Sequence, residues 1–375
     1  MKALFTVILL SFFSLAMAQD YFMLIGTYTS GGSNGIYVHQ FNSVTAITKL
    51  IDSIKITNPS YLTVSPNKKF VYAVSEDANE KNMGGKVSSF SFDNIKGSLS
   101  LLNEQPSNGN HPCYITIDKT GRWIITANYS SGTLAVLPVR SNGSLDPAVT
   151  TIQHSGQSVN TDRQTGPHVH ATVLSPDNSY LFVPDLGLDK LMQYRFDKRN
   201  GALKEANDPY VMTKPGSGPR HFEFHPNKKY AYLVEELTGS VSAYTYTSKT
   251  GKLALIQNIS TLPPDFLGYA GSADIHISPD GNFLYVSNRG ESNSIVIYSI
   301  NKKNGSLSVA GYQPTLGKTP RHFSFDPGGN FLLAANQNSN EIIIFKVNKI
   351  TGLLSDTGKR ISVSKPVCIK WIKKK

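Results

Sequence analysis

Cysteine is scarce in this chain, which has 2 cysteines among its 375 residues. Cys113 and Cys368 each fall on the first strand of a repeated unit described below, with one such unit between them. A disulfide requires α-carbons within roughly 7 Å of each other. We therefore expect two free, buried thiols rather than a disulfide, and no metal site built on cysteine.

The apolar run at the N-terminus is too short for a membrane span. It extends from Leu4 to Leu15, follows Lys2, and is ended by the small residues of Ala16-Met17-Ala18 and by Gln19-Asp20. A transmembrane helix needs about 20 apolar residues, whereas a basic start, a short apolar stretch and a small-x-small site are typical of a signal peptide. We predict that residues 1–18 are a signal peptide cleaved after Ala18. The mature protein is then expected to be secreted or periplasmic, with no membrane insertion.

Charged residues are few, at 17% of the chain, and no segment has the composition of a disordered tract. The formal net charge is +11, and a basic balance can indicate a nucleic-acid or membrane partner. No aromatic-basic motif accompanies the lysines, which are dispersed over turns such as 67–69 and 227–229. We predict no nucleic-acid partner, and an attraction for small anionic molecules.

Motifs of several enzyme classes are missing. There is no Gly-x-Ser-x-Gly nucleophile elbow, no glycine-rich phosphate loop and no dinucleotide fingerprint. His168-x-His170 is the one pair with metal-ligand character in this survey, but an alternating pair is common on strands and no third ligand is assigned. We therefore predict neither a metal nor a cofactor.

A repeated pattern dominates the sequence. Each copy reads as an alternating apolar strand, a tight polar turn and a second strand rich in Tyr, Phe, Val and Leu. The turns are spaced by 48 to 57 residues, and they centre on Pro66, Lys119, Pro176, Pro226, Pro279 and Pro327. A second strand pair with a glycine-containing turn follows in most copies, as in IVIYSINKKNGSLSV at 295–309.

Four antiparallel strands per unit of about 50 residues predict a β-propeller. The ends complete each other, because residues 364–372 read as a lone first strand, and residues 22–29 and 35–41 as second and third strands without a first. We predict an all-β, seven-bladed propeller in which the C-terminal strand pairs with the N-terminal strands to close the last blade. Residues 19–375 then form a single domain, and a closed ring is expected to be a monomer.

The repeat also predicts where a binding site lies. Residues that enter the first strand and residues that leave the second strand meet on one face of the disc, whereas the proline turns lie on the other face. The first position holds Ser60, Cys113, His170, Arg220, Ala273 and Arg321, and the next one adds His221 and His322. The second position contributes Glu76, Asn128, Asp185, Glu235, Glu236 and Arg289.

Polar and charged residues converging on one channel mouth favour a binding site. Arginine is seldom buried without a partner, and three arginines facing one cavity repel unless anions or carboxylates hold them. For the Asn and Asp positions, closure of turns and bridges between blades is an equally good interpretation. His225, in a turn on the far face, is expected to be structural, and His276 is consistent with either role.

The segments GPRHFEFHPNKKYAYLVEEL, ADIHISPDGNFLYVSNR and PRHFSFDPGGNFLLAANQ resemble the lactonase family of seven-bladed propellers. That family includes the propeller-type 6-phosphogluconolactonases and the carboxy-cis,cis-muconate lactonizing enzymes. The resemblance covers essentially the whole mature chain and implies a cofactor-free site of one His, two Arg and one Glu. By motif position, these are His170 in PHVHATVLSPD, Arg220 in GPRH, Glu236 in VEEL and Arg289 in SNRG.

The expected function is hydrolysis of a sugar or phosphorylated sugar lactone to the open-chain aldonic acid. Arg220 and Arg289 would hold the anionic group, and Glu236 and His170 would share the acid and base roles in an order that the sequence leaves open. The surrounding residues of the channel mouth are expected to bind substrate: His168, His221, Arg321, His322, Glu76, Asn128, Asp185 and Glu235. The alternatives are a muconate-type lactonizing enzyme and a binding propeller without catalysis.

Overall fold

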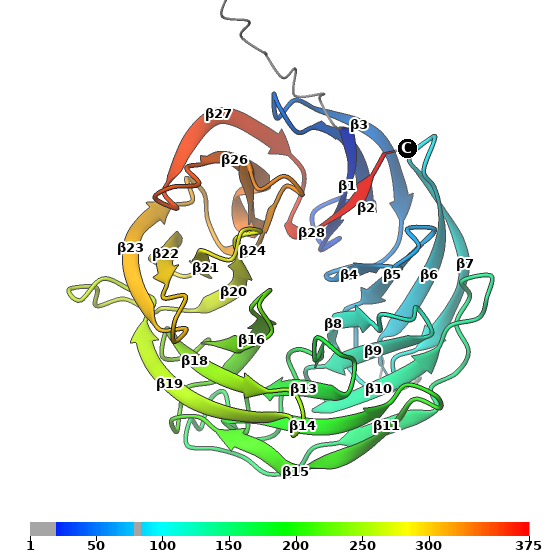
Figure 1. Cartoon of the computed structure of the whole chain (residues 1–375). Helices are drawn as coiled ribbons and strands as arrows, with labels where there is room; N and C mark the ends of the chain where they lie inside the picture. Colours follow the sequence, from blue (N-terminus) through cyan, green and yellow to red (C-terminus); the bar gives the residue numbers. More distant parts are fainter. Residues whose placement is uncertain (1–19, 79–83, 375) are drawn as a thin grey trace, which may run out of the picture.

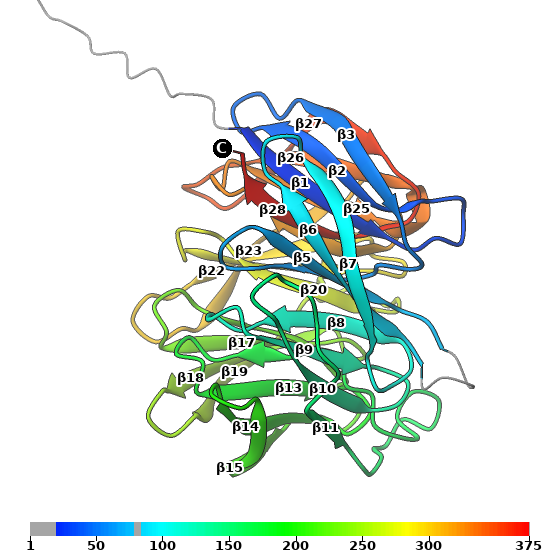
Figure 2. The same cartoon turned by 90° about the vertical axis from the view of Figure 1, so that its right-hand side faces the viewer.

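The computed structural model describes residues 20–78 and 84–374, which form seven four-stranded antiparallel sheets around one axis (Figure 1). Within these ranges, the one helical segment is the short 3₁₀ turn η1, Gln337–Ser339. The sheets stack side by side as the blades of a disc, seen edge-on in Figure 2. The predicted all-β, seven-bladed propeller is therefore confirmed.

Each blade has four strands, numbered from the axis outward except in blade 3, where the chain order is the same. Blade 1 comprises β28 (Pro366–Lys373), β1 (Asp20–Thr27), β2 (Gly35–Asn42) and β3 (Thr48–Lys55). Blade 2 comprises β4 (Leu62–Val64), β5 (Phe70–Ser75), β6 (Lys86–Asp93) and β7 (Ser98–Pro106), and blade 3 comprises β8 (Pro112–Ile117), β9 (Trp123–Asn128), β10 (Thr133–Pro138) and β11 (Thr150–Gln153). Blade 4 comprises β12 (Val173–Leu174), β13 (Tyr180–Asp185), β14 (Lys190–Asp197) and β15 (Ala202–Met212), and blade 5 comprises β16 (Pro219–Phe224), β17 (Tyr230–Glu235), β18 (Ser240–Thr247) and β19 (Lys252–Ser260). Blade 6 comprises β20 (Ser272–Ile277), β21 (Phe283–Asn288), β22 (Ser294–Ile300) and β23 (Leu307–Pro314), and blade 7 comprises β24 (Pro320–Phe325), β25 (Phe331–Asn336), β26 (Glu341–Val347) and β27 (Leu354–Ser362).

Blade 1 joins the two ends of the chain. Strand β28 pairs antiparallel with β1, so that Leu24 faces Lys370 and Ile25 faces Ile369 across the ladder. The ring is thus closed by backbone hydrogen bonds between residues more than 340 positions apart, as the complementary ends of the sequence predicted. The N-terminal residues 1–18, where the signal peptide is predicted, lie outside the described residues.

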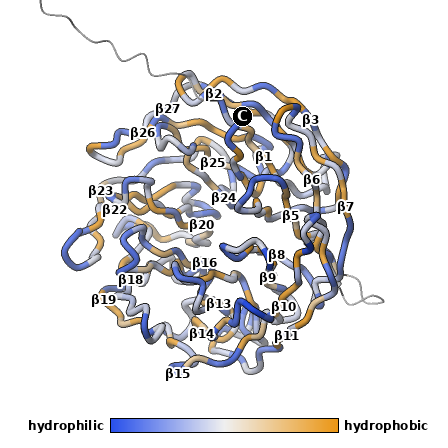
Figure 3. Tube along the Cα trace, turned by 45° about the vertical axis from the view of Figure 1, so that its right-hand side comes forward, coloured by the Kyte–Doolittle hydropathy of each residue, from blue (hydrophilic) through white to orange (hydrophobic). Residues whose placement is uncertain are grey.

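The hydrophobic core lies between neighbouring blades rather than within one of them. One cluster unites Phe182 of blade 4 with Phe222 and Tyr244 of blade 5, and another unites Phe41 of blade 1 with Phe331 of blade 7. Figure 3 shows apolar stretches along the strands and hydrophilic residues in many of the connecting loops. Because each sheet is covered on both faces by its neighbours, the inner strands are buried almost throughout, as the burial pattern of β9 illustrates.

Glycines in the turns between the third and fourth strands set the spacing of the blades. A side chain at these glycines would strike an aromatic ring at the start of the second strand of the preceding blade, as in the pairs Gly97–Phe22, Gly201–Trp123, Gly251–Tyr180, Gly305–Tyr230 and Gly352–Phe283. Gly305 has a φ of +76°, and a Cβ placed there would lie 2.5 Å from the Tyr230 ring. The hydroxyl of Tyr232 also donates to the Gly305 carbonyl at 3.0 Å. The repeated glycine is therefore a contact point between blades.

Replacing Gly305 with Ala should destabilise the propeller more than replacing Gly358 with Ala. Both residues have positive φ, which costs an L-residue about 1–2 kcal/mol. Gly358 has no neighbour within 4 Å, whereas the new methyl at position 305 meets a ring and adds an overpacking cost of about 1–3 kcal/mol. Urea unfolding of the two variants measures the difference, and equal unfolding midpoints would show that the Gly–aromatic contact does not hold the blades.

Two further predictions are tested by the described residues. Cys113 and Cys368 are both free and buried, as expected from their placement on β8 and β28 with blade 2 between them. Over residues 20–78 and 84–374, no helix has the length and apolar character needed to cross a membrane.

Candidate functional site at one end of the central channel

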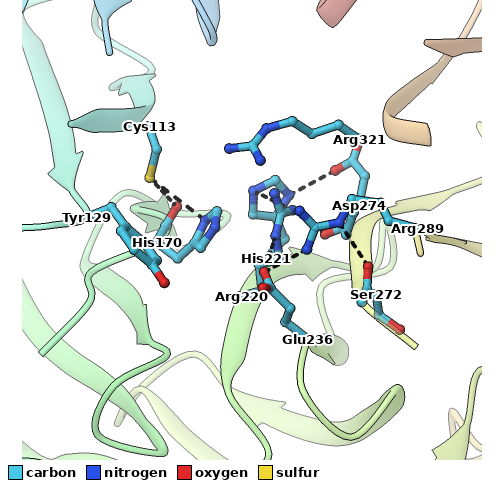
Figure 4. Close-up of polar contacts among 12 residues, drawn as sticks. Cys113, Tyr129, His170, Arg220, His221, Glu236, Ser272, Asp274, Arg289 and Arg321 are labelled. Carbon is cyan, nitrogen blue, oxygen red and sulfur yellow. Dashed lines mark hydrogen bonds and ion pairs between the residues drawn. The ribbon is translucent and has the colours of Figure 1, made fainter. Parts of the chain in front are cut away.

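The first strand of each blade lines the axis, and its entry point meets the exit of the second strand on one face of the disc. In blade 5, for example, Pro219 at the start of β16 pairs with Glu235 at the end of β17. Arg220, Arg321 and Cys113 therefore lie on first strands, while Glu76, Glu236 and Arg289 directly follow second strands. Figure 4 shows these side chains gathered from several blades.

Glu236 is the centre of this group, because three arginines share its carboxylate. Arg220 Nε donates to Oε2 at 2.9 Å, Arg163 Nη2 donates to Oε1 at 2.8 Å, and Arg289 Nη2 forms an ion pair with Oε2 at 3.0 Å. Burial alone would raise the Glu236 pKa, but Arg289, Arg220 and Arg163 together lower it to about 2. Glu236 is thus firmly ionised and has little basicity.

Arg220 is 1% exposed and is held at both ends of its guanidinium. Besides its bond to Glu236, its Nη1 donates to the Ala273 carbonyl and lies 3.3 Å from His221 Nε2. Burial, and then the neighbouring Arg289, lower the Arg220 pKa to about 10, so that the group stays cationic at neutral pH. Arg289 is anchored by Nε, which donates to the Gly271 carbonyl at 2.9 Å.

Arg321 is the least engaged of the four arginines. Its guanidinium makes no hydrogen bond within the described part of the chain. Its nearest carboxylate is Glu76, with Nη2 to Oε1 at 3.8 Å, and its Cζ lies 5.4 Å from the centroid of the Tyr28 ring. The Tyr28 hydroxyl occupies the other Glu76 oxygen at 2.9 Å. Figure 4 shows the Arg321 side chain extended toward the side of the group where Cys113 and His170 lie.

His170 faces the arginines from blade 4, and it is 4% exposed. Its ring is flanked by Tyr129, and its Nδ1 lies 3.8 Å from the Cys113 sulfur. Burial, followed by the positive charge of Arg220, holds the His170 pKa well below its usual value. Nε2 has no hydrogen bond to any described residue. His170 is therefore a neutral imidazole with one nitrogen free for a bound molecule.

The charges of the group do not balance. Arg163, Arg220, Arg289 and Arg321 bring four positive charges, against the two carboxylates of Glu76 and Glu236. The neutral His170 adds none. An excess of buried guanidinium groups at one channel mouth is stabilised when an anion binds there, because guanidinium offers paired donors to phosphate or carboxylate oxygens.

Comparison with known proteins places the chain in a family. The family described as "Lactonase, 7-bladed beta-propeller" matches residues 22–371. The chain belongs to this family. It is similar to 6-phosphogluconolactonases of Formosa agariphila, 39% identical over 84% of this chain and 89% of the relative, and of Bacillus subtilis, 35% identical over 94% and 98%. A solved structure of a periplasmic gluconolactonase of Pseudomonas aeruginosa has a TM-score of 0.89 with 36% identity, covering 95% of this chain and all of that one.

Three residues predicted to bind substrate in this lactonase-family protein are instead occupied by structural hydrogen bonds. Asn128 donates to the Ser107 carbonyl and to Thr133, Asp185 accepts from His154 at 2.6 Å, and Glu235 accepts from Ser240, Ser242 and Asn258. All three are fully buried, and no hydrogen bond or ion pair within the described ranges connects them to the arginines. The structure therefore favours the turn and blade-bridging interpretation for these positions.

The predicted histidines divide into two groups. His168 stacks on Tyr129 with ring centroids 4.5 Å apart, and its Nδ1 lies 3.1 Å from the Tyr129 carbonyl oxygen, at the edge of the site. His221 and His322 lie one layer deeper in the channel, next to Asp274. His225 Nε2 lies 2.9 Å from the Gly281 carbonyl oxygen, in the turn region, as expected for a structural residue.

Several members of the group were missed by the comparison of repeats. Arg163 and the ring of Tyr129 contact Glu236 and His170, and Tyr28 contacts Glu76. Arg163 lies between β11 and β12, outside the repeated pattern, so no alignment of repeats contains it. Asp274 occupies the same repeat position as His221 and His322, and that register is the signal that would have found it.

Proposed function

We propose that this protein is a lactone hydrolase of the 6-phosphogluconolactonase type, which opens a sugar lactone that carries an anionic group. The observation that carries the proposal is the neutral His170 beside four guanidinium groups that only two carboxylates neutralise. Such a site attracts an anionic ester and offers a base for water. Membership of the lactonase family, and the names of the relatives, support the same chemistry.

In the proposed mechanism, His170 handles the protons. Its free Nε2 accepts a proton from the water that attacks the lactone carbonyl carbon, and a tetrahedral intermediate with a negatively charged oxygen forms. The bond between the carbonyl carbon and the ring oxygen then breaks. The resulting imidazolium returns the proton to the leaving ring oxygen, which gives the open-chain hydroxy acid. No covalent enzyme intermediate and no cofactor are needed for these steps.

The arginines supply the electrostatic part of the mechanism. Arg321, which has the fewest contacts, binds the phosphate or carboxylate of the substrate, and Arg289 offers an Nη2 that lacks hydrogen-bond geometry toward Glu236. A buried guanidinium near the carbonyl oxygen stabilises the charge that develops there, and the low-dielectric surroundings strengthen this effect. Arg220 is fixed by Glu236 and by the Ala273 carbonyl, which suits a group whose position must not change during the reaction.

Glu236 is assigned a positioning role rather than the role of base. A carboxylate whose pKa lies at about 2 takes a proton from water poorly, because efficient general bases have pKa values near the working pH. Its contacts with three arginines instead hold their guanidinium groups together against mutual repulsion. This assigns the proton transfers to His170 and the alignment of cations to Glu236.

The predicted signal peptide places this reaction outside the cytoplasm. A relative with the same fold is named a periplasmic gluconolactonase, which supports a periplasmic or secreted protein that acts on aldonolactones present there. The closed ring supports action as a monomer.

A lactone panel tests the function. Base uptake at constant pH should be followed for glucono-1,5-lactone, its 6-phosphate and an uncharged lactone without hydroxyl groups, each corrected for spontaneous opening. The anionic lactone is expected to have the highest kcat/KM. A lack of enzyme-dependent opening of every lactone, together with binding of inorganic phosphate, would identify a binding propeller without catalysis.

A further inference from the structure

A cluster of histidines surrounds Asp274 in the channel, one layer below the arginines. Asp274 Oδ1 lies 2.9 Å from His221 Nδ1, and Oδ2 lies 3.0 Å from His276 Nε2 and 3.6 Å from His322 Nε2. The three blades 5, 6 and 7 supply these residues from the first strands β16, β20 and β24. The proposed lactonase mechanism uses none of them directly. Figure 4 shows Asp274 close to His221 and Arg220.

His322 is the residue in this cluster without an explanation. Its side chain is buried, at 1% exposure, and neither Nδ1 nor Nε2 has a hydrogen-bond partner among the described residues. Burial holds its pKa well below the usual value, so the ring is neutral and one nitrogen carries a lone pair. Buried polar groups are nearly always satisfied, and an unsatisfied one points to an ion or a water molecule that completes the site.

The surroundings of His276 match those of a metal ligand. Its Nδ1 lies 2.9 Å from Glu223 Oε2, so the Glu223 carboxylate fixes the ring and directs Nε2 toward Asp274 and His322. Metal-binding histidines commonly donate their second nitrogen to a carboxylate in this way. Asp274 is oriented similarly, since His221 occupies Oδ1 and leaves Oδ2 for another partner.

An open path leads to the cluster from the face of the disc that carries the proline turns. A cavity of about 370 Å³ extends from Lys119 and Pro176 in two of these turns to His276 and Asp274. Tyr61 and Tyr114 line the same cavity, and Lys370 lies over the Tyr61 ring. An ion can therefore reach His276 without passing the arginines at the other end of the channel.

We propose that Asp274, His276 and His322 bind a divalent transition-metal ion, of which Zn²⁺ is the best match, with a fourth position open to this cavity. The donor atoms lie within 4.8 Å of one another. Zinc bonds of about 2.0–2.2 Å to nitrogen and oxygen place ligand atoms roughly 3.3–3.6 Å apart in a tetrahedron. The Asp274–His322 distance already falls in this range, and His276 must move by only a few tenths of an ångström from Asp274.

The ion would connect the channel to the lactonase site. His221 lies between Asp274 and Arg220, with its Nε2 3.3 Å from Arg220 Nη1. A metal that fixes Asp274 therefore fixes His221, and through it the guanidinium of Arg220. The ion would also join blades 5, 6 and 7 across the axis. Since the site is argued from its own contacts, it stands whether or not the proposed lactone is the substrate.

Metal binding by the whole protein tests the proposal. Protein treated with a chelator and then dialysed against Zn²⁺ should retain one ion per chain by elemental analysis, and its Tm should rise with the Zn²⁺ concentration. His322→Gln should abolish both effects, and Glu223→Gln should weaken binding by about 10- to 100-fold. His225→Gln, which changes a histidine on the turn face, should bind like the unaltered protein. Co²⁺ in place of Zn²⁺ should give the visible absorption of a tetrahedral ion.

Three outcomes would overturn the assignment. Retention of no zinc by the unaltered protein would show that a proton shared by Asp274, His276 and Glu223 fills the site instead. Equal retention by the unaltered protein and His322→Gln would place the ion elsewhere on the surface. Loss of binding in His225→Gln as well would indicate that misfolding, not loss of a ligand, explains the variants.

Discussion

Replacing His170 with Gln should lower kcat/KM for lactone hydrolysis by roughly a hundred- to ten-thousandfold, the usual contribution of a positioned acid or base. Gln retains a polar side chain of similar size but cannot accept and return a proton. The four arginines remain, so binding of an anionic substrate analogue should change little. Initial rates on the best lactone of the panel, together with Kd for inorganic phosphate, separate the two effects.

The matched control is His225→Gln, at a histidine on the opposite face of the disc. This variant should hydrolyse lactones at the rate of the unaltered protein. If both variants lost activity equally, the loss would reflect stability rather than chemistry. Full activity in His170→Gln would rule out His170 as the base and return that role to a carboxylate.

The pH profile gives an independent check on His170. Burial and the charge of Arg220 keep its pKa well below 6.5, so the ring stays unprotonated when the pH falls from 7.5 to about 5.5. The value of kcat/KM should therefore stay level over this interval, whereas an exposed histidine would lose its function as base. Arg321 also lowers the His170 pKa, so in Arg321→Ala the acid limb of the profile should move to higher pH.

The repeated sequence predicted the fold because each repeat is one blade and each blade uses the same contacts. Proline turns, alternating strands and glycine turns against aromatic rings recur, so that the pairing of β28 with β1 follows from the incomplete ends. The same register located Arg220, Glu236, Arg289 and His170, because these side chains replace packing residues at positions that face the channel mouth.

Contacts that depend on one side chain's direction could not be predicted in this way. Asn128, Asp185 and Glu235 occupy the same repeat position as Glu76, yet their side chains turn into the blades, where buried donors are available. Arg163 comes from a connection between blades whose path the repeat does not specify. The order of the His170 and Glu236 roles depends on how many guanidinium groups surround each residue, and this count exists only in three dimensions.

Replacing Glu236 with Gln should destabilise the protein by about 3–5 kcal/mol, the cost of removing one partner from a buried ion pair. Arg163, Arg220 and Arg289 would lose the carboxylate that they share, and three cations would face each other with only the more distant Glu76 left. Activity should fall as well, because the guanidinium groups lose their positions. Urea unfolding and lactone hydrolysis measure the two losses.

The response to anions distinguishes positioning by Glu236 from a direct role in proton transfer. Phosphate can replace the missing negative charge between the arginines, so it should raise the Tm of Glu236→Gln more than that of the unaltered protein. The neighbouring carboxylate Glu235 accepts only from Ser240, Ser242 and Asn258, so Glu235→Gln should respond to phosphate like the unaltered protein. A stable but inactive Glu236→Gln without this anion response would mean that Glu236 is the base. Restored stability in phosphate would mean instead that its negative charge is needed to hold three arginines in place.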